Sequence, residues 1–181
     1  PLVSVKTEQL LVVDIGGGST ELVWIDLSRV PRVDRPRAIM RLHTGFDPKD
    51  SAFPAAKVID WISVPLGVAT LRDQFDDVDD DAARFALMSW FFEENLEEFS
   101  PYKDADQVRE GFQIVGTSGT VTTVAASHLG LKRYDRNKVD GLRMTSDQID
   151  HVIQGYLHMG PEGRRTDPRI GKDAHALIMG G

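Results

Sequence analysis

Three consecutive glycines stand between two apolar runs near the start of the chain, in the stretch LLVVDIGGGSTELVWID at residues 10–26. The run at 10–14 is typical of a buried strand, and the more alternating run at 21–26 predicts a second strand. The glycines between them must turn the chain, so the stretch predicts a β-hairpin. A tight hairpin needs one or two glycines and no carboxylates. The third glycine, Asp14 and Glu21 therefore call for another explanation.

A glycine-rich turn can bind a phosphate group, because its amides form a concave nest and no side chain blocks the approach of a ligand. Asp14 ends its predicted strand, where the site residues of α/β sheets are commonly found. The alternative is a glycine-rich hairpin that binds nothing. The candidate phosphate-binding residues of this turn are Gly16, Gly17, Gly18, Ser19 and Thr20.

A second loop of small residues follows a predicted strand at 112–115 and precedes a helix that ends near Gly130. A helix start offers unpaired amides and a partial positive charge, which suit an anion. The loop matches neither the dinucleotide fingerprint nor the Walker loop. A nucleophile elbow at Ser118 would need a glycine at position 120, and a helix start without a ligand is the structural alternative. The candidate phosphate-binding residues here are Gly116, Thr117, Ser118, Gly119 and Thr120.

Hydrophobic periodicity and capping residues predict the remaining elements. Further strands are expected at 60–64, near 38–42 and at the end of a loop over 131–144. Helices are expected at 68–75, at 82–99, from a capping box at Thr145 and Gln148 to Pro161 and Gly163, and at 173–179. The acidic run 76–81 lacks the glycine and the closing glutamate of a calcium loop and is interpreted as a solvated helix entrance.

Residues 29–60 form a predicted loop-rich insertion with little periodicity. A loop this long inside a compact domain is usually functional or mobile, so it is either a solvated insertion or a contact for an anion. Its arginines are Arg29, Arg32, Arg35, Arg37 and Arg41. The order of all these elements predicts an α/β or α+β fold with a mixed sheet, because the first hairpin is antiparallel.

Composition excludes several classes of function. A net charge of −7 gives the chain no electrostatic footprint for nucleic acid. The absence of cysteine excludes disulfides, thiolate zinc sites and cysteine nucleophiles, and it fits the cytoplasm. No membrane span or signal peptide is visible, and both ends of the chain look cut. None of the histidines shows the spacing of metal ligands: His43, His128, His151, His158 and His175.

The stretches DIGGGSTEL, SVPLGVATL and IVGTSGTVTTVAA, with YDRNKVDG downstream, resemble the exopolyphosphatase and guanosine pentaphosphate phosphatase family. A further similarity lies in the closing stretch, RIGKDAHALIMGG. The resemblance implies an RNase H-like domain of the actin-like ATPase type, with a mixed five-stranded sheet and helices on both faces. It also implies that residues 1–181 form a single domain, the second of two. The missing N-terminal domain would supply another phosphate loop and a catalytic glutamate.

This resemblance implies hydrolysis of a terminal phosphoanhydride bond of inorganic polyphosphate or guanosine pentaphosphate. Asp14 would help to bind Mg²⁺, and Glu21 would orient or deprotonate the attacking water and serve as a second metal ligand. Metal and amides together would let an acidic protein bind a polyanion. The chain alone is expected to be nearly inactive, and relatives of full length suggest a homodimer.

Two other functions fit the same fold. A non-catalytic sensor of phosphate or guanosine tetraphosphate would need the glycines and hydroxyls but neither Asp14 nor Glu21. An actin-like ATPase or a sugar-kinase-type phosphotransferase would need a platform for a nucleoside base. The loop at 116–120 has no aromatic residue beside it to provide one.

Overall fold

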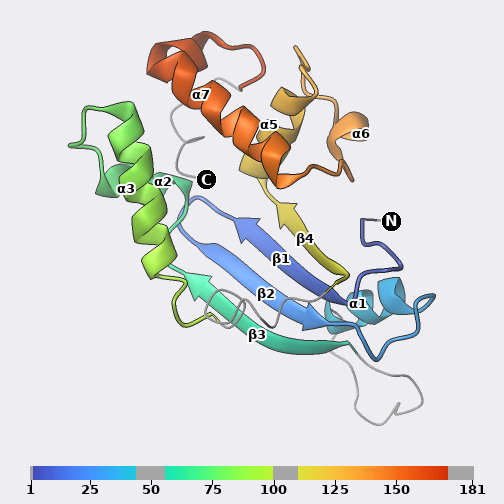
Figure 1. The fold of residues 1–181 in the computed structure, drawn as a ribbon. Helices are drawn as coiled ribbons and strands as arrows, with labels where there is room; N and C mark the ends of the chain where they lie inside the picture. The colour runs from blue at the N-terminus through green and yellow to red at the C-terminus, as the bar shows by residue number, and fades with distance from the viewer. Residues whose placement is uncertain (1, 44–55, 100–109, 171–181) are drawn as a thin grey trace. The chain divides into compact units, whose positions relative to one another are not determined.

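The computed structural model describes residues 2–43, 56–99 and 110–170 (Figure 1). The chain divides into two compact units. The first comprises Pro1–Val13, Glu21–Ser63 and Leu96–Val115, and the second comprises Asp14–Thr20, Val64–Asn95 and Gly116–Gly181.

The first unit contains most of a mixed sheet, and the strand ends at 14–15, 20, 64 and 116–117 are assigned to the second unit. Its strands are β1 (Gln9–Ile15), β2 (Thr20–Asp26), β3 (Lys57–Val64) and β4 (Phe112–Thr117), in the spatial order β3-β2-β1-β4. The arrows in Figure 1 show β1, β3 and β4 running one way and β2 the other. The predicted hairpin and the predicted α/β fold with a mixed sheet are therefore confirmed. In the described parts of the chain the sheet has four strands instead of the expected five.

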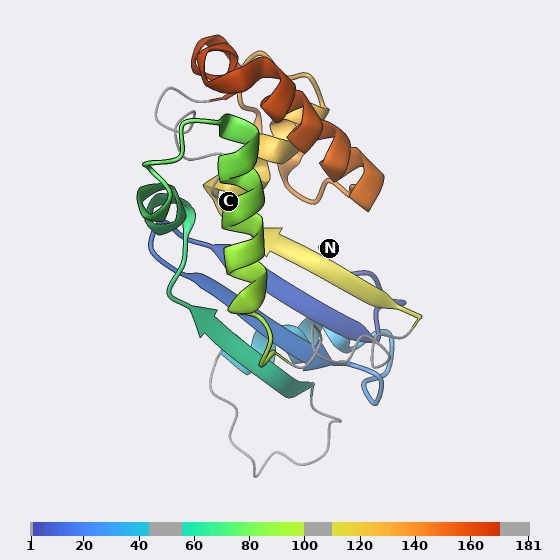
Figure 2. The same cartoon turned by 60° about the vertical axis from the view of Figure 1, so that its left-hand side comes forward.

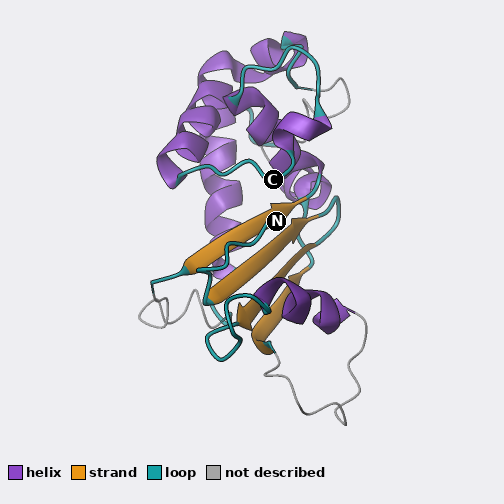
Figure 3. Cartoon of the chain, turned by 90° about the vertical axis from the view of Figure 1, so that its right-hand side faces the viewer, coloured by secondary structure: helices purple, strands orange, loops and turns teal. Residues whose placement is uncertain are grey.

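Helix α1 (Arg35–His43) occupies the segment where a loop and a strand near 38–42 were predicted, so that prediction is wrong. Pro36 lies in the first turn of the helix, where a missing amide hydrogen costs nothing, so the proline does not prevent the helix. Ala38 and Ile39 of α1 pack on the buried core of this unit, which is formed by Leu10, Ile25, Leu27, Val30 and Ala56. Figure 3 shows α1 lying along the sheet.

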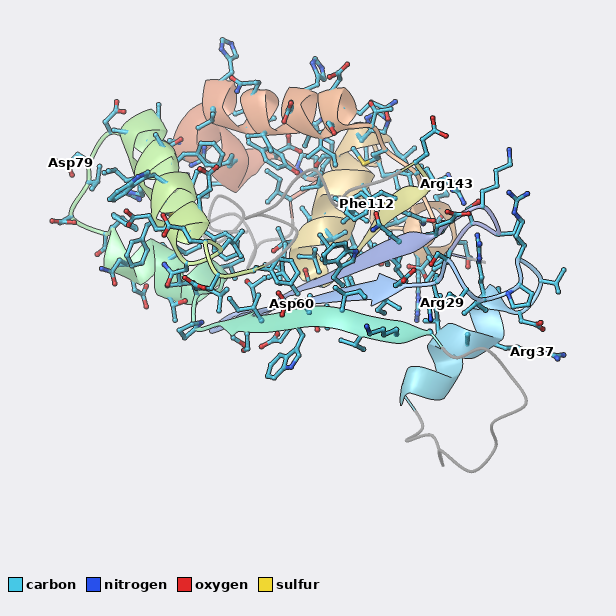
Figure 4. The ribbon with its side chains drawn as sticks, turned by 60° about the horizontal axis from the view of Figure 1, so that its bottom comes forward. Arg29, Arg37, Asp60, Asp79, Phe112 and Arg143 are labelled. Atoms are coloured by element: carbon cyan, nitrogen blue, oxygen red, sulfur yellow. The ribbon has the colours of Figure 1, made fainter. Side chains whose placement is uncertain are left out.

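One arginine of this segment, Arg35, links three stretches of the first unit. Arg35 is buried: its Nε donates to the carbonyl of Val30 at 3.1 Å, and its Nη1 donates to the carbonyl of Val5 at 2.8 Å. Glu8 compensates the buried charge, with its Oε1 3.6 Å from Arg35 Nη2. By contrast, Arg37 is exposed and points away from α1 (Figure 4).

The second unit is helical. It contains α2 (Val68–Gln74), α3 (Asp81–Glu94), α5 (Gly119–His128), α6 (Arg136–Val139) and α7 (Ser146–Thr166), and Figure 2 shows the long helices α3 and α7. The helices expected at 68–75 and after the 116–120 loop are confirmed. The helix expected at 82–99 ends earlier, at Glu94. Where the 131–144 loop was expected to end in a strand, the structure has α6 and irregular chain.

The predicted start of α7 is confirmed, but its end is not. Thr145 and Gln148 form the expected capping box, with contacts of 2.9 and 3.3 Å. Gly160 adopts a φ of 66°, which breaks the helix and is a backbone conformation that favours glycine. Pro161 then opens a second helical segment that continues to Thr166, because a proline is well placed in a first turn.

A buried ion pair joins α3 to α7 within this unit. Arg164 donates to both carboxylate oxygens of Asp81 at 2.7 and 2.6 Å and to the carbonyl of Tyr156 at 2.9 Å. Burial raises the pKa of the Tyr156 hydroxyl, which donates to Ser127 Oγ at 2.6 Å. Such contacts fix one arrangement of the two helices, because an unpaired buried charge is costly.

Two further sequence expectations concern the end of the chain and the membrane. The helix expected at 173–179 and most of the closing family-like stretch lie outside the described residues. Among the helices that the structure describes, none has the length and apolar character to cross a membrane.

Candidate functional site

The turn between β1 and β2 uses its three glycines in different ways. The amide of Gly16 donates to the carbonyl of Ser19 at 2.8 Å, and a Cβ on Gly16 would lie 2.9 Å from that oxygen. Gly16 is therefore required by the turn itself. A Cβ on Gly17 or Gly18 would meet nothing within 4 Å, so packing does not demand glycine at either position. Both are exposed, and without side chains they leave the backbone of the turn accessible.

The amides of this turn are open to a ligand. In the described parts of the chain, no hydrogen bond engages the amides of Gly17, Gly18 or Ser19. Successive unpaired amides in a turn form an anion-binding nest. Thr20 contributes differently from the prediction. Its side chain is buried, and its hydroxyl donates to the carbonyl of Leu66 at 2.8 Å instead of facing the turn.

The start of α2 clamps the carbonyl side of the same turn. The amide of Val68 donates to Gly16 O at 3.1 Å, and that of Ala69 donates to Gly17 O at 2.9 Å. Gly67 makes this approach possible, because a Cβ there would lie only 2.3 Å from Gly16 O. The clamp holds the carbonyls of the turn, and it uses the amides of α2 that would otherwise attract an anion. Sequence reasoning found SVPLGVATL only as a resemblance and missed this role for Gly67.

The second glycine-containing loop leads into α5 with a strained residue. Ser118 precedes the helix with φ 126° and ψ 173°, a region that is essentially restricted to glycine. Its hydroxyl oxygen is buried and has no hydrogen-bond partner in the described residues, so no base contacts it as a nucleophile elbow requires. A contribution of Ser118 to a site would therefore come from its backbone.

The start of α5, unlike that of α2, donates its first amides to no carbonyl in the part of the chain that the structure describes. Among the described residues, no hydrogen bond engages the amides of Gly119, Thr120 or Val121. The positive end of the helix dipole adds to these donors. Thr122 and Thr123 donate their hydroxyls to the carbonyl of Gly119, at 3.0 and 2.8 Å, and so stabilise the first turn.

The structure brings Asp14 together with the second loop. The hydroxyl of Thr117 donates to Asp14 Oδ1 at 2.7 Å, and both residues are exposed. This contact follows from the topology, because β1 and β4 are parallel neighbours and their carboxyl ends lie at the same edge of the sheet (Figure 1). Asp14 and both candidate loops belong to the second unit.

Glu21 belongs to the first unit and has its own hydroxyl partner. It follows Thr20 at the start of β2, and Ser63, near the end of β3, donates to Glu21 Oε1 at 3.1 Å. The two strands are antiparallel neighbours, so these ends meet. Ser63 is the first residue of the SVPLGVATL stretch, which sequence reasoning noted only as part of a resemblance, so this contact with Glu21 was missed.

A magnesium ion fits the donors beside Asp14. Mg²⁺ in phosphoryl-transfer sites takes one or two carboxylates and completes its shell with water and substrate phosphates. Asp14 offers such a carboxylate next to open amides. In the part of the chain that the structure describes, no three His, Cys, Asp or Glu side chains gather as a closed metal cage. Asp14 would therefore hold the ion, together with the phosphates of a substrate.

The strain at Ser118 gives a first testable prediction. Ser118→Gly relieves an unfavourable φ and removes an unsatisfied hydroxyl, whereas Ser118→Ala removes only the hydroxyl. We expect the glycine variant to have a free energy of unfolding about 1 kcal/mol above that of the alanine variant, measured by urea denaturation. An alanine variant as stable as the glycine variant would show that Ser118 is not held in this conformation.

Comparisons with known proteins identify the family. The model of the Ppx/GppA phosphatase family matches residues 3–166. A crystal structure of an exopolyphosphatase-like protein is 28% identical over 95% of this chain and 46% of that chain, with a TM-score of 0.69. A comparison with curated proteins found no match.

Two more distant structures agree in fold. The Aquifex aeolicus member of the Ppx/GppA family is 24% identical over 97% of this chain and 46% of that one, with a TM-score of 0.66. An exopolyphosphatase from Cytophaga hutchinsonii is 17% identical over 97% of this chain and 48% of its own, with a TM-score of 0.61. This chain thus spans just under half the length of these proteins and has their actin-like fold. The chain belongs to the Ppx/GppA phosphatase family.

Proposed function

We propose that this chain is one half of an enzyme that hydrolyses the terminal phosphoanhydride bond of inorganic polyphosphate or guanosine pentaphosphate. The proposal depends on two sets of backbone amides without hydrogen-bond partners in the described residues, one at Gly17–Ser19 and one at the start of α5. The carboxylate of Asp14 is hydrogen-bonded to Thr117 of the second loop. Family membership supports a phosphatase reaction of this general kind.

Each group has a role in phosphoryl transfer, which depends mainly on positioning and charge neutralisation. The amides of Gly17, Gly18 and Ser19 and those of the α5 start bind phosphate oxygens. Asp14 would hold Mg²⁺, and the ion would supply positive charge to neutralise the phosphates. Glu21, held by Ser63, accepts a proton from the attacking water or orients it.

The remaining part of the site belongs to a preceding domain in this proposal. The matched structures are about twice as long as this chain, which fits a cleft with a second wall. That wall would supply a further phosphate loop and a second glutamate. Asp14 and Glu21 favour catalysis over sensing, because a phosphate sensor needs only the amides.

A phosphate-release assay tests this proposal. A longer protein that includes the preceding domain is expected to release phosphate from polyphosphate or guanosine pentaphosphate in a magnesium-dependent manner. This chain by itself is expected to be at least about a thousandfold slower, because it lacks the groups that complete the site. Rapid release by the chain alone would contradict the proposed division. If the longer protein binds guanosine tetraphosphate in calorimetry and turns over neither substrate, the sensor function is correct instead.

A further inference from the structure

The hydroxyl of Thr117 is the hydrogen-bond donor that the structure gives to Asp14, and it lies on the neighbouring strand. The 2.7 Å contact engages Oδ1, and no hydrogen bond reaches Oδ2 in the described residues. We propose that Thr117 is a positioning residue, which holds the Asp14 carboxylate so that its second oxygen is available to a divalent cation. This inference rests on the proposed function, and in particular on the cation role of Asp14.

The surroundings of the contact favour positioning over stability. Asp14 and Thr117 are both exposed, so neither side chain is needed to fill the core. A hydrogen bond in contact with water contributes little to folding, since water replaces either partner. The hydrogen bond from a hydroxyl to a carboxylate is nonetheless short and directional, so it restricts the rotation of the Asp14 side chain.

The chemistry of the threonine is also specific. Its hydroxyl has one proton to donate, and in the structure the acceptor is Asp14 Oδ1. A carboxylate that binds a metal is commonly held by such a second hydrogen bond, and loss of that bond typically weakens metal binding by about 10- to 100-fold. Valine has nearly the shape of threonine and no hydroxyl, so Thr117→Val removes the hydrogen bond to Asp14 Oδ1 and keeps the branched side chain.

Titration with Mn²⁺ measures the effect without relying on turnover. Bound Mn²⁺ broadens the NMR signals of nearby amides, so the response of Asp14 and Gly17 reports occupancy of this site in the chain. We expect the midpoint for Thr117→Val to lie about tenfold above that of the unaltered chain. Thr117→Ser keeps the hydroxyl and should restore most of the affinity. Asp14→Asn should abolish site-specific broadening.

Thr166→Val is the matched control. Among the described residues, the hydroxyl of Thr166 donates to two backbone carbonyls of its own helix and to no side chain: Glu162 O and Gly163 O, both at 3.1 Å. Its Mn²⁺ midpoint should equal that of the unaltered chain, and thermal unfolding should show that the two valine variants are similarly folded.

The possible outcomes separate the inference from the function beneath it. An unchanged midpoint for Thr117→Val, together with a loss for Asp14→Asn, overturns the role of Thr117 and leaves the proposed function intact. Equal weakening by Thr117→Val and Thr117→Ser also overturns it, because the hydroxyl would not be the cause. No site-specific broadening, or broadening that survives Asp14→Asn, contradicts both the inference and the cation role of Asp14.

Discussion

Replacing Asp14 with asparagine is expected to lower kcat of the full-length enzyme by about a thousandfold or more, equal to about 4 kcal/mol of transition-state stabilisation. The asparagine side chain has the same shape, and its oxygen still accepts from Thr117, so the turn keeps its geometry. What the substitution removes is the negative charge that holds Mg²⁺ in the proposed mechanism. Steady-state phosphate release at saturating magnesium measures the effect.

Asp26→Asn is the control for this experiment. Asp26 ends β2, and its Oδ1 accepts from the amide of Ser28 at 2.8 Å, a contact that asparagine preserves. The two variants thus undergo the same chemical change with the same kind of bond retained. We expect Asp26→Asn to keep kcat within about twofold of the unaltered enzyme, since surface substitutions change little. A near-normal rate for Asp14→Asn would remove Asp14 from the mechanism.

Replacing Gly67 with alanine is the second change for which we expect a large effect. The added Cβ would lie 2.3 Å from Gly16 O, 2.7 Å from Gly17 C and 2.8 Å from Gly17 O, and all three are backbone atoms. The turn must move, and the hydrogen bonds that the amides of Val68 and Ala69 donate to it must lengthen or break. We expect a loss of about 1–3 kcal/mol in the free energy of unfolding and of about 100-fold in kcat/KM.

Gly155→Ala shows what the same substitution does without a clash. Gly155 lies inside α7, and a Cβ there would meet nothing within 4 Å. Alanine is a better helix former, so this variant should gain about 0.5–1 kcal/mol. Urea denaturation of both variants and phosphate release by the longer protein give the comparison. Gly67→Ala with unaltered stability and activity would mean that the turn does not depend on the clamp.

Local patterns in the sequence were sufficient for the parts of the site that lie on one continuous stretch. The apolar runs around Gly16–Gly18 predicted the hairpin, because strand patterning and turn glycines act over a few residues. The capping box at Thr145 was predicted for the same reason. The small-residue loop before α5 was also recognised from a strand, a loop and a helix in sequence.

Contacts between distant stretches could not be predicted in this way. Gly67 lies about fifty residues beyond the turn that it supports, and Thr117 is separated from Asp14 by 103 positions. Nothing in either local stretch reveals its partner. Only the strand order, which places β4 next to β1, brings Thr117 to Asp14. The resemblance to a family marked the right stretches without explaining them.

Prolines and arginines misled the interpretation of one segment. The residues around Pro31 and Pro36 were expected to form a loop, yet α1 begins at Arg35. The helix depends on the buried contacts of the Arg35 guanidinium with Val30 and Val5, and tertiary contacts of this kind override local propensity. In α7 the helix was expected to end at Pro161 and Gly163, whereas the chain breaks at Gly160 and then continues as helix to Thr166.

The two exposed glycines of the turn bear on how the enzyme would choose its substrate. A phosphate bound by main-chain amides is recognised as a phosphate whatever it is attached to, since every residue type has the same backbone. Changes at Gly17 or Gly18 can block such a site, but they cannot make it distinguish inorganic polyphosphate from a guanosine nucleotide. A preference for one of these substrates must therefore come from side chains outside the turn. Relatives can differ in substrate while the sequence of the turn stays the same.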